Sequence, residues 1–250
     1  MSTSSPQSTS TSTGSIALVG PGRLGRVLAR ALTASGCEVH EPVGRTDAVP
    51  AADVVLLCVP DEQITTAAAK ARQVPGALVG HTSGATGLDD VDFGIHPLQT
   101  ITGDESGDAF RGASCAVAGR TDAALQAALR VAAMIGARPS EIADEQRAGY
   151  HAAASLASNA LVALLDAAER TAHAAGVPDA RTALAPLVRR TVENWTATGA
   201  AALTGPVVRG DEETVARQRA ALQEAAPDIL PLFDELTVRM RGLVAERDTR

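Results

Sequence analysis

The sequence predicts a doubly wound α/β domain with a mainly parallel sheet, followed by an all-α C-terminal domain. Three observations predict this fold class. Short apolar runs alternate with helical periodicity up to about residue 143, a glycine-rich turn directly follows the first of these runs, and strand signals vanish after Asp144. We therefore expect a disordered Ser/Thr-rich leader at 1–14, an α/β domain at 15–143 and a helical domain at 144–250.

Composition and charge argue against several classes of protein. The chain has 250 residues, of which 45% are apolar, and a net charge of −7, which disfavours a broad basic surface for nucleic acid. Its three cysteines lie far apart without CxxC spacing, which indicates reduced thiols in a cytoplasmic protein and no metal site. The longest apolar stretch, Ala152–Leu165, falls short of the roughly 18–20 residues that span a bilayer, so we expect no membrane span.

The α/β domain is expected to alternate strands and helices. Its strands are expected at 16–19, 37–43, 53–59, 77–80, 93–95, 113–117 and 138–142. The run at 53–59 (DVVLLCV) is continuously apolar, as in a strand that is covered on both faces. Helices are expected after the glycine-rich turn, after Pro60 with Asp61 as the N-cap, and at 123–135.

The C-terminal domain is expected to consist of alanine-rich helices. They are placed at 145–175, 179–198, 212–225 and 228–246, with Asp211 as an N-cap. The whole chain contains only one Trp and three Phe, so these helices have few large side chains with which to build a core. We therefore expect a homodimer in which the C-terminal helices complete their core against a second subunit.

The turn after the first strand has the spacing GxGxxG. In this pattern Gly20 permits a tight turn, Gly22 lets the backbone approach a pyrophosphate, and Gly25 lets helix and strand pack closely. Free N–H groups and the positive end of the helix dipole then meet the anion. The residues expected to hold a dinucleotide here are Gly20, Pro21, Gly22, Arg23, Leu24 and Gly25.

The end of the second expected strand indicates which dinucleotide is bound. An NAD site usually has a carboxylate about 20 residues after the glycines, whereas this chain has Gly44, Arg45 and Thr46 there. Arg45 could bind a 2′-phosphate, which favours NADP over NAD; an ordinary surface arginine is the alternative. Two later strand ends face the same crevice and are also expected to contact the cofactor, at Val59, Pro60 and Asp61 and at Thr82, Ser83 and Gly84.

Six segments carry a family resemblance over residues 15–245. GPGRLG, VVLLCVPDEQI, GHTSGATGL, GIHPLQT, YHAAASLASNALVALLDAAE and LTGPVVRGD resemble Rossmann-like proteins whose helical C-terminal domain is of unknown function. That group is similar in layout to pyrroline-5-carboxylate reductases, ketopantoate reductases, 6-phosphogluconate and 3-hydroxyacid dehydrogenases, and deazaflavin-dependent NADP reductases. The resemblance implies a nicotinamide-dependent oxidoreductase, frequently dimeric, with an active site between the domains.

Hydride transfer to a carbonyl or imine needs a proton donor, and several of these relatives use a lysine. The single lysine of this chain, Lys70, is expected on a helix of the first domain, so a lysine-centred mechanism is disfavoured. His151, Ser155 and Asn159 are spaced i, i+4, i+8 and fall within about 80° of one helix face. We expect His151 to donate the proton, Asn159 to hold the substrate and Ser155 to bridge them, with His96 as the second choice of acid.

Two other interpretations of the helix face remain open, namely a solvated face and a satisfied core. Arg209 is a candidate for binding a substrate carboxylate. The expected function is that of an NADP-dependent oxidoreductase acting on a small carbonyl or imine, similar to ketopantoate or pyrroline carboxylate. The alternatives are a deazaflavin-linked NADP reductase and a dinucleotide-binding sensor or interaction protein without turnover.

Overall fold

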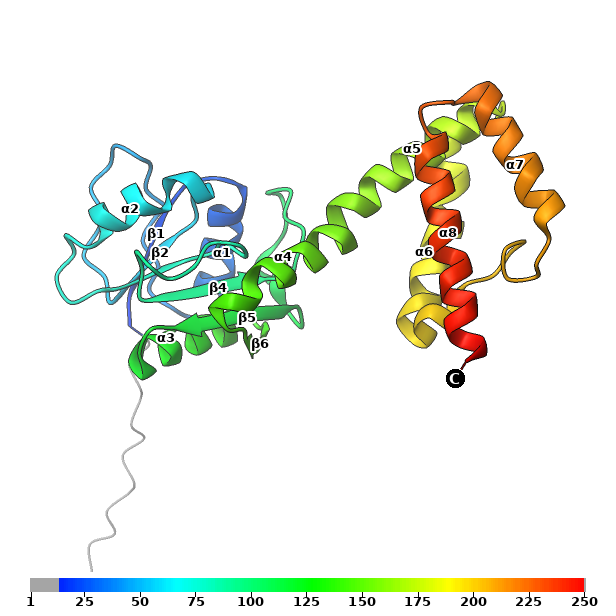
Figure 1. The fold of residues 1–250 in the computed structure, drawn as a ribbon. Helices are drawn as coiled ribbons and strands as arrows, with labels where there is room; N and C mark the ends of the chain where they lie inside the picture. The colour runs from blue at the N-terminus through cyan, green and yellow to red at the C-terminus, as the bar shows by residue number, and fades with distance from the viewer. Residues whose placement is uncertain (1–13, 250) are drawn as a thin grey trace, which may run out of the picture. The chain divides into compact units, whose positions relative to one another are not determined.

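The computed structural model describes residues 14–249, apart from the side chain of Asp248, so the expected leader lies almost wholly outside the described residues. The chain forms two compact units, the first ending at Ser158 and the second beginning at Asn159 (Figure 1). Strands end at Glu141, and every later element of the described chain is helical. The division between the units therefore falls inside a helical run, beyond the change of architecture expected at 143.

The first unit is built on one six-stranded sheet in the order β1-β2-β3-β4-β5-β6. The strands are β1 (Ile16–Val19), β2 (Val54–Leu57), β3 (Leu78–His81), β4 (Phe93–Pro97), β5 (Ser114–Gly119) and β6 (Arg138–Glu141). All neighbouring pairs are parallel except β4 and β5, which are antiparallel. This arrangement confirms the expected fold class, a Rossmann-like α/β domain followed by a helical region.

The expected strand at 37–43 is not a regular strand, although its residues lie along β1 on the side away from β2. Parallel bridges join Val39 to Ile16 and Val43 to Val19. In a regular ladder residue 42 would donate the next hydrogen bond to Leu18, but Pro42 has no N–H, and the N–H of Val43 donates to the Leu18 carbonyl instead (2.9 Å). The segment at 37–43 thus lies on one side of β1, and the next strand, β2, lies on the other side. This reversal makes the carboxyl end of β1 a topological switch point.

Helices cover both faces of the sheet, because each places an apolar stripe against it. On one face, α1 (Arg23–Ala34) buries Val27, Leu28, Ala31 and Leu32, which recur at helical spacing. Beside it lies α3 (Asp122–Met134), whose N-cap Thr121 accepts the N–H of Ala124. On the other face, the 3-10 turn η1 (Asp61–Gln63) leads into α2 (Ile64–Ala71). The strand β6 lies at the end of the sheet with all four residues exposed.

One helical run links the units in sequence. It consists of η3 (Asp144–Gln146), α4 (Arg147–Ser155), a π-helical turn η4 (Leu156–Ala160) and α5 (Leu161–Ala174). The π turn was not expected, and it breaks the uniform 100° per residue on which the expected face of Ser155 and Asn159 depends. The run of 31 residues is long and apolar enough to cross a bilayer by length and composition alone, so the short stretch at 152–165 is not by itself an argument against a span.

The second unit continues with α6 (Ala180–Thr198), the 3-10 turn η5 (Gly199–Ala202), α7 (Glu212–Ala225) and α8 (Leu230–Asp248). The helices lie within two residues of their expected bounds. The expected N-cap at Asp211 is confirmed, since its carboxylate accepts the N–H of Thr214 (3.0 Å). The buried core of this unit is small and consists of Ala167, Leu222, Ala226, Ile229 and Leu230.

Candidate functional site

A pocket of about 510 Å³ lies in the first unit at the carboxyl ends of β1 and β2. We refer to it as the β1–β2 pocket. It is lined by Val19, Gly20, Pro21, Gly22, Gly44, Arg45, Cys58, Val59, Pro60, Glu62, Gln63, Thr66, Ala67 and Lys70. Its position at the topological switch point is where doubly wound sheets bind their ligands.

The glycines of the turn shape the wall of this pocket by steric necessity. Gly20 has a φ of +110°, and a Cβ there would lie 2.3 Å from the carbonyl oxygen of Cys58. A Cβ at Gly25 would lie 2.0 Å from the carbonyl oxygen of Gly20, so helix and turn touch backbone to backbone. Gly22 instead faces open space, with no atom within 4 Å of a Cβ position, as expected where a ligand approaches the backbone.

The N-terminus of α1 is free to bind an anion. Gly22 is its N-cap residue and, within residues 14–249, no side chain caps this helix end. The first N–H groups of a helix have no partner inside the helix and carry the positive end of its dipole. The Arg26 guanidinium donates to the carbonyl of Pro21 (2.7 Å), which fixes the turn in front of this helix end. These features fit a diphosphate group bound by backbone N–H groups.

The pocket gathers many of the residues expected to bind a cofactor, but not all of them. Gly20, Pro21, Gly22, Gly44, Arg45, Val59 and Pro60 are among its lining residues, whereas Arg23, Leu24, Gly25, Thr46, Asp61, Thr82, Ser83 and Gly84 are not. The side chain of Leu24 packs against the buried cluster between the sheet and the helices α1 and α3. Asp61 is not an N-cap as expected; Pro60 occupies that position, and the Asp61 carboxylate accepts a hydrogen bond from Ser83 Oγ (2.9 Å).

Sequence reasoning missed the role of Lys70 in this pocket. Its Nζ donates to the carbonyl oxygen of Arg45 (3.0 Å) and to that of Asp47, so the only lysine of the chain holds the loop at 44–47. Within this loop the Asp47 carboxylate accepts the N–H of Gly44 (2.7 Å). The place of Lys70 in the last turn of the helix after the third expected strand was the available signal.

A second group of side chains meets around Gly84, in the loop after β3. We define the histidine cluster as His81, His96 and His151 around this glycine. A Cβ at Gly84 would lie 2.7 Å from His151 Nδ1 and 2.7 Å from His96 Cε1, so both rings pack too closely against this glycine to leave room for a side chain. The two rings meet edge to face with their centroids 5.8 Å apart. Among the described residues His151 Nδ1 has no hydrogen-bond partner although it is buried.

Burial sets the charge of His96. Loss of solvent, together with the nearby His151 and Arg147, lowers the pKa of this imidazole to about 4, so the ring is neutral at neutral pH. Its Nδ1 lies 3.0 Å from the hydroxyl of Tyr150, whose pKa burial raises to about 12. The Tyr150 hydroxyl therefore keeps its proton and donates to His96 Nδ1 or to the His96 carbonyl (3.2 Å). Tyr150 is a member of this site that sequence reasoning did not single out as a site residue.

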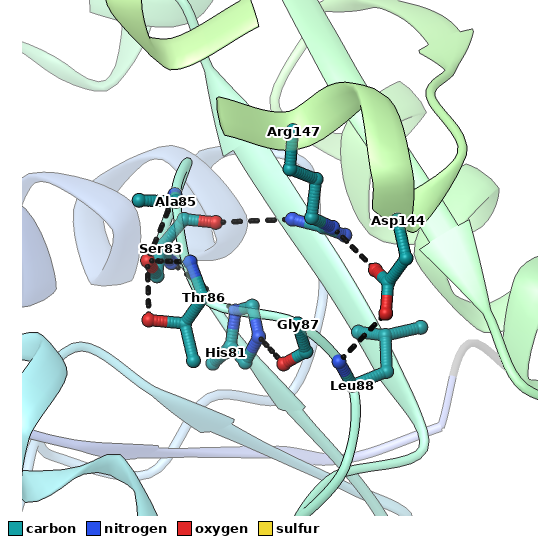
Figure 2. Close-up of polar contacts among 8 residues, drawn as sticks. All are labelled: His81, Ser83, Ala85, Thr86, Gly87, Leu88, Asp144 and Arg147. Carbon is teal, nitrogen blue, oxygen red and sulfur yellow. Dashed lines mark hydrogen bonds and ion pairs between the residues drawn. The ribbon is translucent and has the colours of Figure 1, made fainter. Parts of the chain in front are cut away.

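Arg147 anchors the first turns of the helical run to the loop after β3, as Figure 2 shows. Its side chain is 4% exposed, its Nε donates to Asp144 Oδ1 (2.8 Å) and its Nη1 reaches the carbonyl of Ser83 (3.4 Å). The other oxygen of Asp144 accepts the N–H of Leu88 (3.3 Å). Because positions i and i+4 share a helix face, this anchor sets His151 against Gly84. The spacing of Arg147 and His151 was the signal that could have found it.

His81 is the structural member of the cluster. Its Nδ1 accepts the N–H of Ser83 (3.2 Å) and its Nε2 donates to the carbonyl of Gly87 (3.0 Å), so both ring nitrogens are satisfied by a neutral ring (Figure 2). Burial lowers the pKa of His81, in agreement with that neutral state. Ser83 Oγ in turn accepts the N–H groups of Ala85 and Thr86, which closes the loop around Gly84.

Three further residues that were expected in the site, Ser155, Asn159 and Arg209, are not part of the histidine cluster. Ser155 is the last residue of α4 and is partly buried, and Asn159 is exposed in the π-helical turn. A π turn within an α-helix is rare and is often found at functional sites. Arg209 is exposed in the loop before α7. The roles expected of these residues stay predictions.

A family model described as "Domain of unknown function (DUF2520)" matches residues 113–240, just over half of the chain. The chain belongs to the DUF2520 family. This confirms the resemblance to Rossmann-like proteins with a helical C-terminal domain of unknown function. No curated protein matches this DUF2520 chain.

Solved structures share the fold over nearly the whole length of this DUF2520 chain. A Bacteroides fragilis protein provisionally assigned as an NADP oxidoreductase is 22% identical, with a TM-score of 0.75 over 93% of this chain and 100% of that one. A Thermotoga maritima protein is 24% identical, with a TM-score of 0.74 over 94% and 100%. The NADP-bound pyrroline carboxylate reductase of Plasmodium falciparum is 8% identical, with a TM-score of 0.60 over 93% and 99%.

Proposed function

We propose that this protein is an NADP-dependent oxidoreductase that reduces a small carbonyl or imine compound. The observation that carries the proposal is the β1–β2 pocket, in which the uncapped N-terminus of α1 and the open face of Gly22 lie at a topological switch point. This combination suits a dinucleotide diphosphate. The provisional assignment of the Bacteroides fragilis protein and the NADP bound to the Plasmodium falciparum reductase support the same cofactor class.

Arg45 supports NADP rather than NAD. It lines the pocket just after the segment that runs along β1, where the ribose 2′ position lies in such folds. A guanidinium binds a phosphate through two parallel charge-assisted hydrogen bonds. We expect Arg45→Ala to weaken NADPH binding about tenfold and to change NADH binding by less than about twofold.

Bound NADPH would supply the hydride, and the chain must supply the proton. His151 is the better donor of the two candidate histidines, because His96, with a pKa of about 4, carries no spare proton at neutral pH. The Tyr150–His96 pair orients the ring that faces His151, and Arg147 fixes the helix that carries His151. Asn159 and Ser155 are proposed to hold the substrate oxygen or nitrogen, and Arg209 to bind a substrate carboxylate.

A stepwise binding and turnover experiment tests this function. Calorimetric titration with NADPH and NADH comes first, followed by an absorbance screen of 2-oxo acids and cyclic imines that includes ketopantoate and pyrroline carboxylate. His151→Ala is expected to abolish turnover and to keep NADPH affinity, while the matched His173→Ala, in α5, keeps both. NADPH binding with no turnover of any substrate class would favour a sensor, and binding of neither nucleotide would refute the proposal.

We further propose a homodimer formed through the helices of the second unit. Large apolar side chains are exposed there, among them Val162, Leu187, Trp195 and Val238 at 62–67% of their surface. Exposed apolar surface of this extent is typical of an interaction face. Light scattering after size-exclusion chromatography is expected to give twice the chain mass, and a Leu187→Glu variant is expected to give the mass of one chain.

A further inference from the structure

We propose that Lys70 gives the β1–β2 pocket its preference for a 2′-phosphorylated dinucleotide, because it holds the loop at 44–47 and adds a second cation beside Arg45. This inference rests on the proposed function, since it concerns the cofactor that the function requires. It assigns a role in cofactor binding to Lys70, which the sequence disfavours as a proton donor.

The contacts of Lys70 join two segments that are distant in the sequence. Its Nζ, in the last turn of α2, donates to the carbonyl oxygens of Arg45 and Asp47. A protonated amine has three N–H donors, and these two carbonyls use two of them. The third donor and the positive charge are left for an anion in the pocket that Lys70 lines.

Within residues 14–249, Lys70 is the only residue outside the loop at 44–47 that hydrogen-bonds to it. The loop's local hydrogen bonds, from the N–H of Gly44 to the Asp47 carboxylate and from the N–H of Asp47 to the Gly44 carbonyl, shape a turn but connect it to nothing else. Arg45 and Thr46 are exposed. A side chain on a loose loop loses much freedom when it binds a ligand, and a loop that is already held reduces this cost.

The charge on this wall of the pocket is opposite to that of the whole chain. The chain carries −7, whereas Arg45 and Lys70 outnumber the single carboxylate among the lining residues, that of Glu62. Two cations match a phosphate group that carries nearly two negative charges at neutral pH. A 2′-hydroxyl carries no charge, so the same donors would gain a hydrogen bond to it but no attraction between opposite charges, and the pair discriminates between the two dinucleotides.

Calorimetry on the full chain tests this role. Lys70→Met keeps the apolar stem and removes the charge, and it is expected to weaken NADPH binding about tenfold or more but NADH binding less than about threefold. Lys70→Arg is expected to recover most of the NADPH affinity. Arg130→Met is the control, because it removes one positive charge from an exposed position on α3. This helix packs on the face of the sheet opposite to α2, which carries Lys70.

Chemical labelling gives a readout that needs no variant. Because Lys70 is the only lysine, an amine-acylating reagent modifies it and the chain N-terminus alone, and peptide mass spectrometry separates the two sites. Adenosine 2′,5′-bisphosphate is expected to protect Lys70 several-fold, while adenosine 5′-monophosphate at equal occupancy protects it far less. The N-terminal amine serves as the internal control.

The outcomes separate this inference from the proposed function. If Lys70→Met weakens NADPH and NADH binding equally, or if the two adenosine phosphates protect Lys70 equally, the proposed role of Lys70 is overturned. The NADP-dependent function would still stand. Failure of the unaltered protein to bind either dinucleotide would overturn both. A selective loss of NADPH affinity together with selective protection supports the role.

Discussion

The two units bury apolar side chains to very different extents. The first unit has two large buried clusters, one on each face of its sheet, which include Leu18, Leu56 and Phe93 at 0% exposure. The described part of the second unit has one buried cluster of five residues, while Leu187 and Trp195 on α6 are each 63% exposed. Instead, ion pairs join α7 to α8, as in Arg219–Asp234 (2.9 Å), and α5 to the turn before α8, as in Arg170–Asp228 (2.7 Å).

This difference shows why the candidate site is built where it is. A binding site needs side chains whose positions are fixed by packing, and both the β1–β2 pocket and the histidine cluster lie in the unit with the complete core. Exposed ion pairs contribute little to stability, so the second unit lacks a comparable source of rigidity. Its apolar surface is free to be buried against a partner instead.

The largest contrast is expected from the same substitution in each unit. Leu56→Ala in β2 removes a fully buried side chain and is expected to lower the free energy of unfolding by about 4 kcal/mol. Leu187→Ala in α6 removes a side chain that is 63% exposed, with an expected loss below about 1 kcal/mol for the isolated chain. Urea denaturation with hydrogen exchange resolved by peptide measures each unit separately. Equal losses would mean that the second unit is as well packed as the first.

A pH effect of about 2 kcal/mol is expected in the first unit. The pKa of His96 is lowered from 6.5 to about 4 in the folded state, so the unfolded chain binds the proton more readily between these values. The free energy of unfolding should therefore fall by about 2 kcal/mol as the pH is lowered from about 7 to about 5. His96→Gln is expected to flatten this dependence in part, since the pKa of His81 is also lowered. An unchanged slope in that variant would contradict the assignment.

Matched glycine substitutions are expected to differ in sign. Gly84→Ala forces a methyl group against His96 and His151 and is expected to cost about 2 kcal/mol and to displace both rings. Gly242→Ala in α8 meets only an ordinary contact of 3.7 Å and is expected to gain about 0.5 kcal/mol, because alanine favours a helix. Thermal denaturation measures both. A neutral Gly84→Ala would show that the histidine rings are not tightly packed.

The smallest contrast concerns two threonines. Thr121 caps α3 through its hydroxyl, and Thr121→Ala is expected to cost about 1 kcal/mol. Thr191 lies within α6, where its hydroxyl donates to the Leu187 carbonyl (2.9 Å), a bond that slightly disfavours the helix. Thr191→Ala should thus gain a few tenths of a kcal/mol. A loss in both variants would contradict the distinction between cap and interior.

Periodicity and turn chemistry predicted most of the fold because they act locally. The apolar stripe of α1, the buried run of β2 and the cap at Asp211 were all visible in the sequence. The irregular segment at 37–43 was not, because its apolar content favoured a strand while Pro42 removed the one N–H that the ladder needed. The π turn at 156–160 is likewise invisible to a pattern that assumes one helical period.

The candidate site was predictable only where one segment carries the signal. The glycine turn and Arg45 were found because their spacing from the first strand is characteristic. The contact of Lys70 with the loop at 44–47, and that of Arg147 with the loop after β3, join segments far apart in the chain. Asp61 was misassigned for a related reason: its local context favoured a cap, but its actual partner, Ser83, comes from the loop after β3.

The exposed last strand, β6, limits how copies of the chain can associate. A bare strand edge normally invites a neighbour's backbone, and this one is only four residues long, with the sequence RPSE. Pro139 has no backbone N–H to donate to another strand, and Arg138 and Glu141 place charged side chains on the same edge strand. Oligomers that continue one sheet across two molecules are therefore disfavoured at this edge, which protects the domain from fibrous aggregation.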